Sequence, residues 1–383
     1  MKNDLNYKIF RIIIAILFIS LVFIAIWNHL DRILTDEIID EKIPMLIQCI
    51  IAFLFYAIVH YTSIILHEVG HLIFGLKSKL KFMSFNIRGF SIVKKNKKLV
   101  IEKSELTKDI GGYCNMQFLD SVKYTNKDVI LYFYGGIIIN IVLALLFLFI
   151  FLLCDNEYIK LLSLLYVIYN FYLAIYNSIP YSNLVGISTD MKHIVNYLHD
   201  SEYIEKIGII DKIMKYRENN KSLKNIDESL LYMPKNFVND YDMTIALVYI
   251  AYLSEKKEYD KMSDSINYVL NNTRNTITEA QKNALKVQKI DCIVHTNFDK
   301  IKLKEIWDNS FNKYINQMSL LSIGGFAFKY LYYMVINENQ NKAEEIMKEY
   351  QNKKRKYPNH QDVKETDEFI RDINNQLNKV SNK

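Results

Sequence analysis

Two histidines and a glutamate stand at the end of a long apolar stretch, in the segment HEVGH. Residues 43–67 contain no Asp, Glu, Lys or Arg, so we expect these ionisable groups at membrane depth, where they are costly and usually functional. His67 and His71 are four residues apart, which places both imidazoles on one face of a helix. The pattern is typical of zinc sites, in which two neutral imidazoles bind the ion and Glu68 acts as general base. Two merely structural histidines would leave Glu68 without a partner in the bilayer.

Zinc needs a further protein ligand, because catalytic sites usually have three such ligands and a water. Asp190 is the best candidate. Asn177 and Pro180 break the apolar segment before it, and the residues up to Thr189 stay uncharged. Non-helical backbone is tolerated at membrane depth where it lines a cavity, so we expect the chain to fold back here toward the histidines. Ser188 or Thr189 would then cap a helix that starts near Asp190, and the alternative is that Asp190 only belongs to that helix start.

Four segments are long enough to cross a bilayer, which takes about 20 apolar residues in a helix. They are residues 12–30, residues 43–76, residues 129–154 and a segment that begins at Leu161 and stays uncharged until Asp190. The first segment could be a signal peptide, but it lacks a small-residue cleavage site, and we interpret it as a retained anchor. The metal-binding pattern therefore lies on the second of four predicted membrane helices.

Basic residues predict how these helices are oriented. The loop after the second segment carries eight of them between Lys77 and Lys98, whereas the loop after the first segment is mainly acidic. By the positive-inside rule, we expect this loop and both termini in the cytoplasm, which agrees with four crossings. The sequence thus predicts a multi-pass protein of the cell membrane, embedded in the lipid bilayer.

Charge and cysteine usage exclude other classes. The net charge of +6 is modest and concentrated in one loop, so no nucleic-acid partner is expected. The cysteines lie far apart, lack metal-finger spacing and are interpreted as free thiols in a reducing setting. They are Cys49, Cys114, Cys154 and Cys292.

The loop at residues 77–126 is expected to carry a small β-hairpin. Its segments FMSFNI and FSIV are rich in β-forming residues, and KKNKK is a plausible turn. Such strands could pair with an unwound peptide by strand addition. We favour instead a role of the lysines in binding anionic lipid headgroups.

Residues 196–383 differ from the rest of the chain. They are charged, contain few glycines and prolines, and alternate apolar with charged helical patches. This pattern predicts stacked helical hairpins, similar to tetratricopeptide repeats but without a clean 34-residue period. Such a stack could bind substrate or a regulatory protein, or be only a soluble appendage, and nothing in it looks catalytic.

Three motifs together resemble the site-2 protease family of intramembrane zinc metalloproteases. HEVGH matches the zinc helix of that family, and GGIIIN, from Gly135 to Asn140, resembles its G-P-x-x-N motif. NSIP followed by Asp190 resembles its Asn-Pro segment ahead of a D-G pair, and GGYCNM at residues 111–116 looks like the stretch after its β-rich loop. The resemblance covers about residues 44–195.

The resemblance also implies roles for single residues. His67, His71 and Asp190 would bind Zn²⁺, and Glu68 would be catalytic. Asn140 and Asn177 would bind the substrate or stabilise the oxyanion; the alternative for Asn140 is a structural hydrogen bond between helices. Gly135 and Gly136 would let helices approach closely.

The chain departs from the family pattern in three places. Ile137 replaces the proline of the G-P-x-x-N motif, and Met191 follows Asp190 where a glycine is usual. The spacing from Pro180 to Asp190 is longer, and we recognise no PDZ or CBS module. The chain therefore resembles a divergent branch of the family.

The predicted fold is mostly α: a polytopic membrane core of about four transmembrane helices, a small β-hairpin insertion and a C-terminal soluble helical domain. We expect an anchor and external loop at residues 1–43, and a zinc-binding core at residues 44–195 that includes a β-rich cytoplasmic insertion at residues 77–126. A cytoplasmic helical domain follows at residues 196–383.

The predicted function is a zinc-dependent endopeptidase that cleaves membrane-protein substrates in or near their transmembrane segments. The alternative is a non-catalytic membrane receptor or immunity-type factor on a protease-like core. A prenyl-protein endopeptidase also uses H-E-x-x-H, but the Asn-Pro-Asp segment, in place of a glutamate ligand, argues against it.

Overall fold

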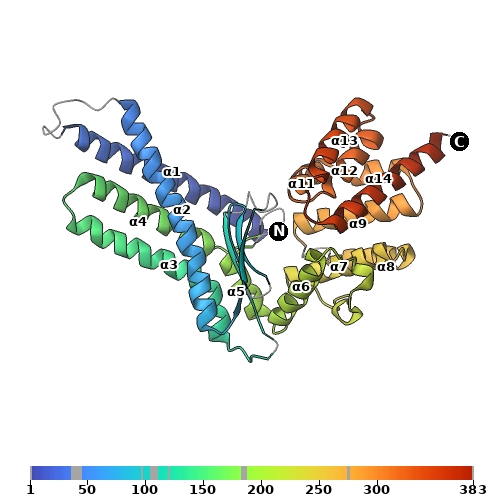
Figure 1. The fold of residues 1–383 in the computed structure, drawn as a ribbon, viewed down its shortest axis with the longest axis horizontal. Helices are drawn as coiled ribbons and strands as arrows, with labels where there is room; N and C mark the ends of the chain where they lie inside the picture. The colour runs from blue at the N-terminus through green and yellow to red at the C-terminus, as the bar shows by residue number, and fades with distance from the viewer. Residues whose placement is uncertain are drawn as a thin grey trace. The chain divides into compact units, whose positions relative to one another are not determined.

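A computed structural model describes the chain except for residues 1, 36–44, 96–97, 104–110, 120, 183–187, 274–276 and 382–383. The described residues are mostly helical and include one small antiparallel sheet (Figure 1). They form two compact units, which we describe one at a time. The first unit comprises Met1–Tyr181 and Ser188–Val195, and the second comprises the rest of the chain.

Four long apolar helices frame the first unit. They are α1 (Lys2–Thr35), α2 (Met45–Lys77), α3 (Asn126–Leu153) and α4 (Glu157–Asn177). Each is long and apolar enough to cross a membrane. Phe53 on α2 and Leu152 on α3 are each 69% exposed, and many apolar side chains beside them are also exposed, as expected for surfaces that lipid covers. The prediction of four helices able to cross a membrane is confirmed.

Local signals set where these helices begin and end. Before α3, Thr125 and Asp128 form a capping box, in which each side chain accepts a hydrogen bond from the backbone N–H of the other. α4 ends at Asn177, ahead of Pro180, as the sequence predicts, because proline cannot continue a helix. A short helix, α5 (Asp190–His199), then begins at Asp190.

Helices α2 and α3 cross at a pair of glycines. A Cβ atom added at Gly70 would lie 2.4 Å from the carbonyl oxygen of Gly135, and one added at Gly135 would lie 2.6 Å from the carbonyl oxygen of Gly70. No larger residue fits without moving the backbones apart, which is why small residues occur at such crossings. Because Gly70 lies within HEVGH, this crossing sets how closely α3 approaches the metal-binding pattern.

Helices α4 and α1 pack onto this pair in turn. The side-chain amide of Asn170 on α4 donates a hydrogen bond of 3.0 Å to the hydroxyl of Ser63 on α2. Phe18 on α1 stacks on Tyr172 of α4, with ring centroids 4.3 Å apart. This ring contact holds α1 against α4.

The sheet contains four strands in the order β3-β2-β1-β4, and all neighbours are antiparallel. The strands are β1 (Lys81–Ile87), β2 (Phe90–Lys95), β3 (Lys98–Lys103) and β4 (Gly112–Gln117). Arg88 and Gly89 join β1 to β2 with φ values of 43° and 86°, and two positive values are what a type I′ hairpin turn requires. The predicted hairpin at KKNKK corresponds to β2 and β3, with residues 96–97 outside the described part. The sequence analysis did not predict the second turn, at Arg88 and Gly89, which joins β1 to β2.

Strand β1 runs back along α2. The N–H of Leu80 donates to the carbonyl of Gly75, and at the other end Arg88 hydrogen-bonds His60 Nε2 at 2.9 Å and the Tyr61 hydroxyl at 3.2 Å. Residues 60 to 75 of a helix span about 22 Å. The sheet therefore flanks the helix turns that carry HEVGH.

The second unit is a helical stack. Its elements are α6 (Tyr203–Glu218), the 3₁₀ turns η2 (Leu223–Asn225) and η3 (Glu228–Leu230), α7 (Asp240–Glu255), α8 (Tyr259–Thr273), α9 (Glu279–His295), α10 (Lys300–Ile306), α11 (Asn309–Leu321), α12 (Gly325–Leu331), the π-helical turn η4 (Tyr332–Ile336), α13 (Gln340–Lys354) and α14 (His360–Ser381). Helices α6 to α9 share one apolar core, in which Ile250 and Met262 are fully buried. The predicted soluble helical part is confirmed as helical.

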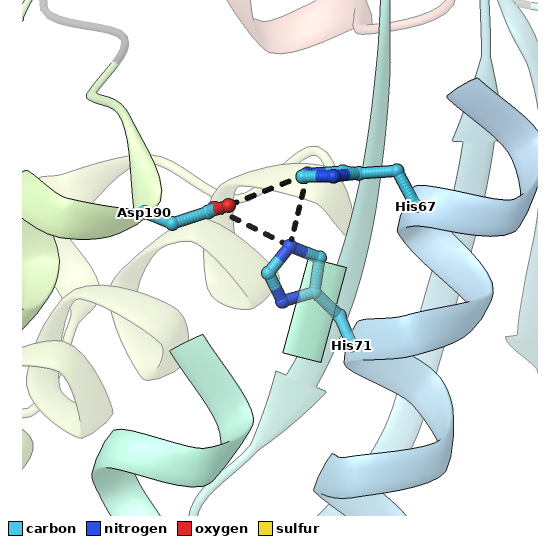
Figure 2. A group of neighbouring side chains, drawn as sticks. All are labelled: His67, His71 and Asp190. Atoms are coloured by element: carbon cyan, nitrogen blue, oxygen red, sulfur yellow. Dashed lines mark hydrogen bonds and ion pairs between the residues drawn. The ribbon is translucent and has the colours of Figure 1, made fainter. Parts of the chain in front are cut away.

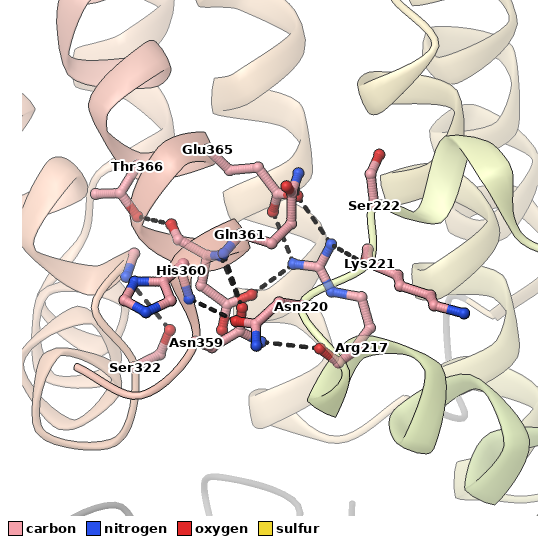
Figure 3. A network of polar contacts seen from close by, with 12 residues as sticks. Arg217, Asn220, Lys221, Ser222, Ser322, Asn359, His360, Gln361, Glu365 and Thr366 are labelled. Atoms are coloured by element: carbon pink, nitrogen blue, oxygen red, sulfur yellow. Dashed lines mark hydrogen bonds and ion pairs between the residues drawn. The ribbon is translucent and has the colours of Figure 1, made fainter.

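Arg217, near the end of α6, ties the last helix to this stack. Its guanidinium donates to both carboxylate oxygens of Glu365 at 2.8 and 2.7 Å (Figure 3). It also donates to Asp362 at 2.5 Å and to Glu255 at 3.0 Å. The side chain of Asn359 also donates to the carbonyl of Arg217. A bidentate arginine pair is among the stronger polar contacts, so this network fixes α14 on α6.

We expect Gly70→Ala to lower the stability of the membrane unit by about 1–3 kcal/mol, because its methyl group would overlap the backbone of α3. Gly208→Ala on α6 is the matched control, since a Cβ there meets nothing within 4 Å, and alanine in a helix is more stable than glycine by about 0.5–1 kcal/mol. Thermal unfolding of the protein in detergent, with hydrogen exchange in α2 and α3 to locate the change, measures both. Unchanged hydrogen exchange in α2 and α3 of Gly70→Ala would contradict the close contact of these helices at Gly70.

Candidate metal centre

Three side chains from two helices converge in the first unit (Figure 2). His67 and His71 project from α2, and Asp190 is the first residue of α5. The two Nε2 atoms are 3.3 Å apart, and the two carboxylate oxygens of Asp190 face them, Oδ2 at 3.3 Å from Nε2 of His67 and Oδ1 at 3.3 Å from Nε2 of His71. Both histidines are buried. The structure thus brings together the three residues that the sequence analysis named as ligands.

The spacing of these donor atoms fits a metal ion. In a tetrahedral zinc site with bonds of about 2.0–2.1 Å to nitrogen and oxygen, neighbouring donors lie about 3.3–3.4 Å apart. The observed separations of 3.3 Å match that value, and two imidazoles with one carboxylate are donors that zinc prefers. These three residues could therefore hold a divalent cation.

Hydrogen bonds behind the rings determine which nitrogen faces the centre. Nδ1 of His71 lies 2.9 Å from the carbonyl oxygen of Tyr132, which can only accept, so Nδ1 carries the proton and Nε2 carries the lone pair. Nδ1 of His67 lies 2.9 Å from the side-chain amide of Asn140. With the carbonyl end of that amide toward the ring, Asn140 accepts the Nδ1 proton, and its buried Oδ1 gains the partner it otherwise lacks. Both Nε2 lone pairs then point at the carboxylate, an arrangement that a cation stabilises.

Gly136 on α3 keeps the space between the donors open. A Cβ atom there would lie 2.5 Å from Nε2 of His67 and 2.6 Å from Nε2 of His71, between the two imidazoles. The sequence interpretation assigned this glycine to close helix packing alone. Its position beside both donors is a further role, and only the three-dimensional crossing of α2 and α3 could have shown it.

Glu68 is buried against strand β4. The backbone N–H of Cys114 donates to its carboxylate, and Glu68 interacts electrostatically with His71, His67 and Asp190. A Cβ added at Gly112 would lie 3.0 Å from Oε1 of Glu68, so this glycine leaves room for the carboxylate. Strand β4 therefore positions the acidic group of HEVGH beside the three donors.

The two asparagines that the sequence analysis expected in the site make different contacts. Asn177 donates to the carbonyl of Leu173, one turn back along its own helix, and this bond does not join it to the cluster. Asn140 contacts His67, which corresponds to the alternative of a hydrogen bond between helices. A contact of either residue with substrate stays a prediction.

The cysteines whose side chains are described are free: Cys114, Cys154 and Cys292. The side chain of Cys49 lies outside the described part. Burial, together with the nearby negative charge of Glu68, raises the pKa of the Cys114 thiol to about 12. Cys114 is thus a neutral thiol at pH 7, and its backbone rather than its sulfur serves the site.

Replacing Gly136 by alanine should remove divalent-metal binding, because the new methyl group would occupy the space between the two Nε2 atoms. Gly111→Ala is the control, since a Cβ at that position meets nothing within 4 Å. Metal content after purification and dialysis against zinc measures the effect. Stoichiometric zinc in Gly136→Ala would show that the ion binds elsewhere.

Asn140→Leu should weaken zinc binding by about ten- to a hundred-fold, as is usual when the partner of a ligating histidine is lost. Asn140→Asp should retain binding, because a carboxylate also accepts the Nδ1 proton of His67. Titration against a chelating indicator compares the two variants. Wild-type affinity in Asn140→Leu would contradict the role of Asn140 in orienting His67.

Comparison with known proteins adds one finding. No curated protein matches the chain, and no solved structure matches it. The model of peptidase family M50 matches residues 55–328, which include HEVGH, GGIIIN and Asp190 and extend beyond the 44–195 range of the resemblance into the helical stack. With most of its length matched and the three donors in place, the chain belongs to peptidase family M50, the site-2 protease family.

Proposed function

We propose that the chain is a zinc-dependent intramembrane endopeptidase, with His67, His71 and Asp190 as the protein ligands. The observation that carries this proposal is the convergence of two Nε2 atoms, 3.3 Å apart, on a carboxylate that places an oxygen 3.3 Å from each, Oδ2 toward His67 and Oδ1 toward His71, beside a buried glutamate. Membership of a metallopeptidase family supports the same chemistry. A zinc ion bound there would polarise the scissile carbonyl and make an attacking water more acidic.

Other residues of the chain transfer the proton and hold the reacting groups in position. Glu68 takes the proton of the attacking water and passes it to the leaving amine, as a general base and then a general acid. The N–H of Cys114 holds its carboxylate in place, and Tyr132 and Asn140 hold the imidazoles of His71 and His67 with Nε2 toward the centre. Asn177 remains a candidate for substrate binding.

The substrate class follows from where the centre lies. HEVGH lies within the apolar span Ile50–Lys77, so a peptide bond that reaches it belongs to a membrane-embedded or membrane-proximal segment. That segment must be locally unwound, because a helical carbonyl is already hydrogen-bonded and shielded by the next turn. The partners we propose are the lipid bilayer and membrane-protein substrates, with a regulatory protein on the helical stack and no nucleic acid. The lysine-rich loop supports cytoplasmic N- and C-termini.

Glu68→Gln should lower the rate of cleavage by a factor of about 10²–10⁴, because an amide cannot take the proton of the water. The variant should still bind zinc. Glu202→Gln, at a side chain that is 70% exposed, is the control and should cleave normally. The measurement compares truncated membrane proteins in cells that express each variant, with zinc content determined on the purified proteins. Full cleavage by Glu68→Gln would refute the proposed mechanism, and a wild-type protein without zinc would favour a non-catalytic receptor.

A further inference from the structure

Arg11 is a charged residue on α1, within the apolar span Ile9–Asn28. Its guanidinium lies between two aromatic rings, 3.9 Å from the ring centroid of Tyr176 and 4.0 Å from that of Tyr181. Its Nε is buried and makes no hydrogen bond. A planar guanidinium stacks well between aromatic faces, so the two tyrosines are an adequate environment for this charge.

Tyr181 is connected directly to the start of α5. The N–H of Thr189 donates to the carbonyl of Tyr181 at 2.9 Å, and the N–H of Tyr181 donates to the Thr189 hydroxyl at 3.2 Å. The same hydroxyl donates to the carbonyl of Ile179 at 2.6 Å. Thr189, whose carbonyl accepts from the N–H groups of Lys192 and His193 at the start of α5, therefore fastens that helix start to the segment that follows α4.

Thr189 immediately precedes Asp190, which supplies the carboxylate of the metal centre. α4 ends at Asn177 and α5 begins at Asp190, so contacts of the start of α5 must fix the position of this carboxylate relative to α2. On the other side, His193 of α5 stacks on Phe133 of α3, with ring centroids 4.9 Å apart and an interplanar angle of 4°. The position of Asp190 thus depends on this stack and on the bonds of Thr189.

We propose that Arg11 is a positioning residue for the metal ligand Asp190. Clamped between Tyr176 and Tyr181, it fixes the segment Ile179–Tyr181 against α1, and Thr189 transmits that position to the carboxylate. Arg11 lies outside the residues 55–328 that match the family, so this clamp is an addition by the N-terminal helix to the matched core. The inference rests on the proposed function of the centre as a zinc site.

The test compares two contacts that hold α1 on α4. Arg11→Gln removes the guanidinium that reaches Tyr181. Phe18→Leu removes a ring that stacks on Tyr172 and meets Tyr169 edge to face, but that does not touch the segment Ile179–Tyr181 in the described contacts. Zinc affinity is measured by competition with a chelator, and the absorption spectrum of bound Co²⁺ reports the ligand geometry. Neither measurement requires a substrate.

We expect Arg11→Gln to lower zinc affinity about ten-fold or more and to change the Co²⁺ spectrum, as for loss of other groups that orient a ligand. Arg11→Lys should recover only part of the affinity, because an ammonium group does not stack as a plane between two rings. Phe18→Leu should keep wild-type affinity and spectrum. Wild-type affinity in Arg11→Gln, or an equal loss in Phe18→Leu, would show that α1 is only an anchor and would overturn the proposal.

Tyr181 provides a second test that leaves Arg11 in place. Tyr181→Phe keeps the ring and should bind zinc as the wild type does, whereas Tyr181→Leu should weaken binding to the level of Arg11→Gln. Equal affinities in the two Tyr181 variants would overturn the clamp. Failure of the wild-type protein to bind zinc is a different result, since it would refute the proposed function itself.

Discussion

Two imidazole nitrogens and a carboxylate are held 3.3 Å from one another in a buried place, and the first unit is arranged around that constraint. Lone pairs and a negative charge at this distance repel one another, and burial removes the water that would screen them. A positive charge among these atoms would relieve that repulsion and stabilise the arrangement. Two close neighbours, Tyr132 and Asn140, orient a donor, and Gly136 leaves the space between the donors open.

Close approach of backbones is what makes this geometry available. Gly70 and Gly135 let α2 and α3 touch, and that contact brings Gly136 and Asn140 to the imidazoles. Gly112 in turn lets β4 approach Glu68 on α2. Glycines on three separate elements thus serve one site, and the energetic cost of glycine in helices and strands is offset by the contacts that it permits.

The sequence was sufficient where structure is local. The spacing of His67 and His71, the break at Pro180 and the helix start at Asp190 depend on residues within a few turns, and the structure reproduces all three. Contacts across helices were not predictable in the same way. Nothing in the chain around Asn140 or Gly136 specifies which face of α2 they meet, because that is decided by the crossing of two helices whose apolar surfaces look alike in sequence. The contacts of Arg11 were not predictable from the sequence for the same reason, since its two partners, Tyr176 and Tyr181, lie more than 160 positions away in the chain.

The structure assigns the sheet a role other than pairing with substrate. Strands beside a peptidase centre suggest a template for an extended substrate, which would add to a free edge. At Cys114, however, the outer edge of β4 is already used: its N–H bonds Glu68, and its carbonyl accepts from the hydroxyl of Tyr132. Tyr132 in turn offers its own carbonyl to His71. β4 is therefore part of the support of the cluster at this point, and a peptide strand could pair with it here only by displacing the groups that hold Glu68 and His71.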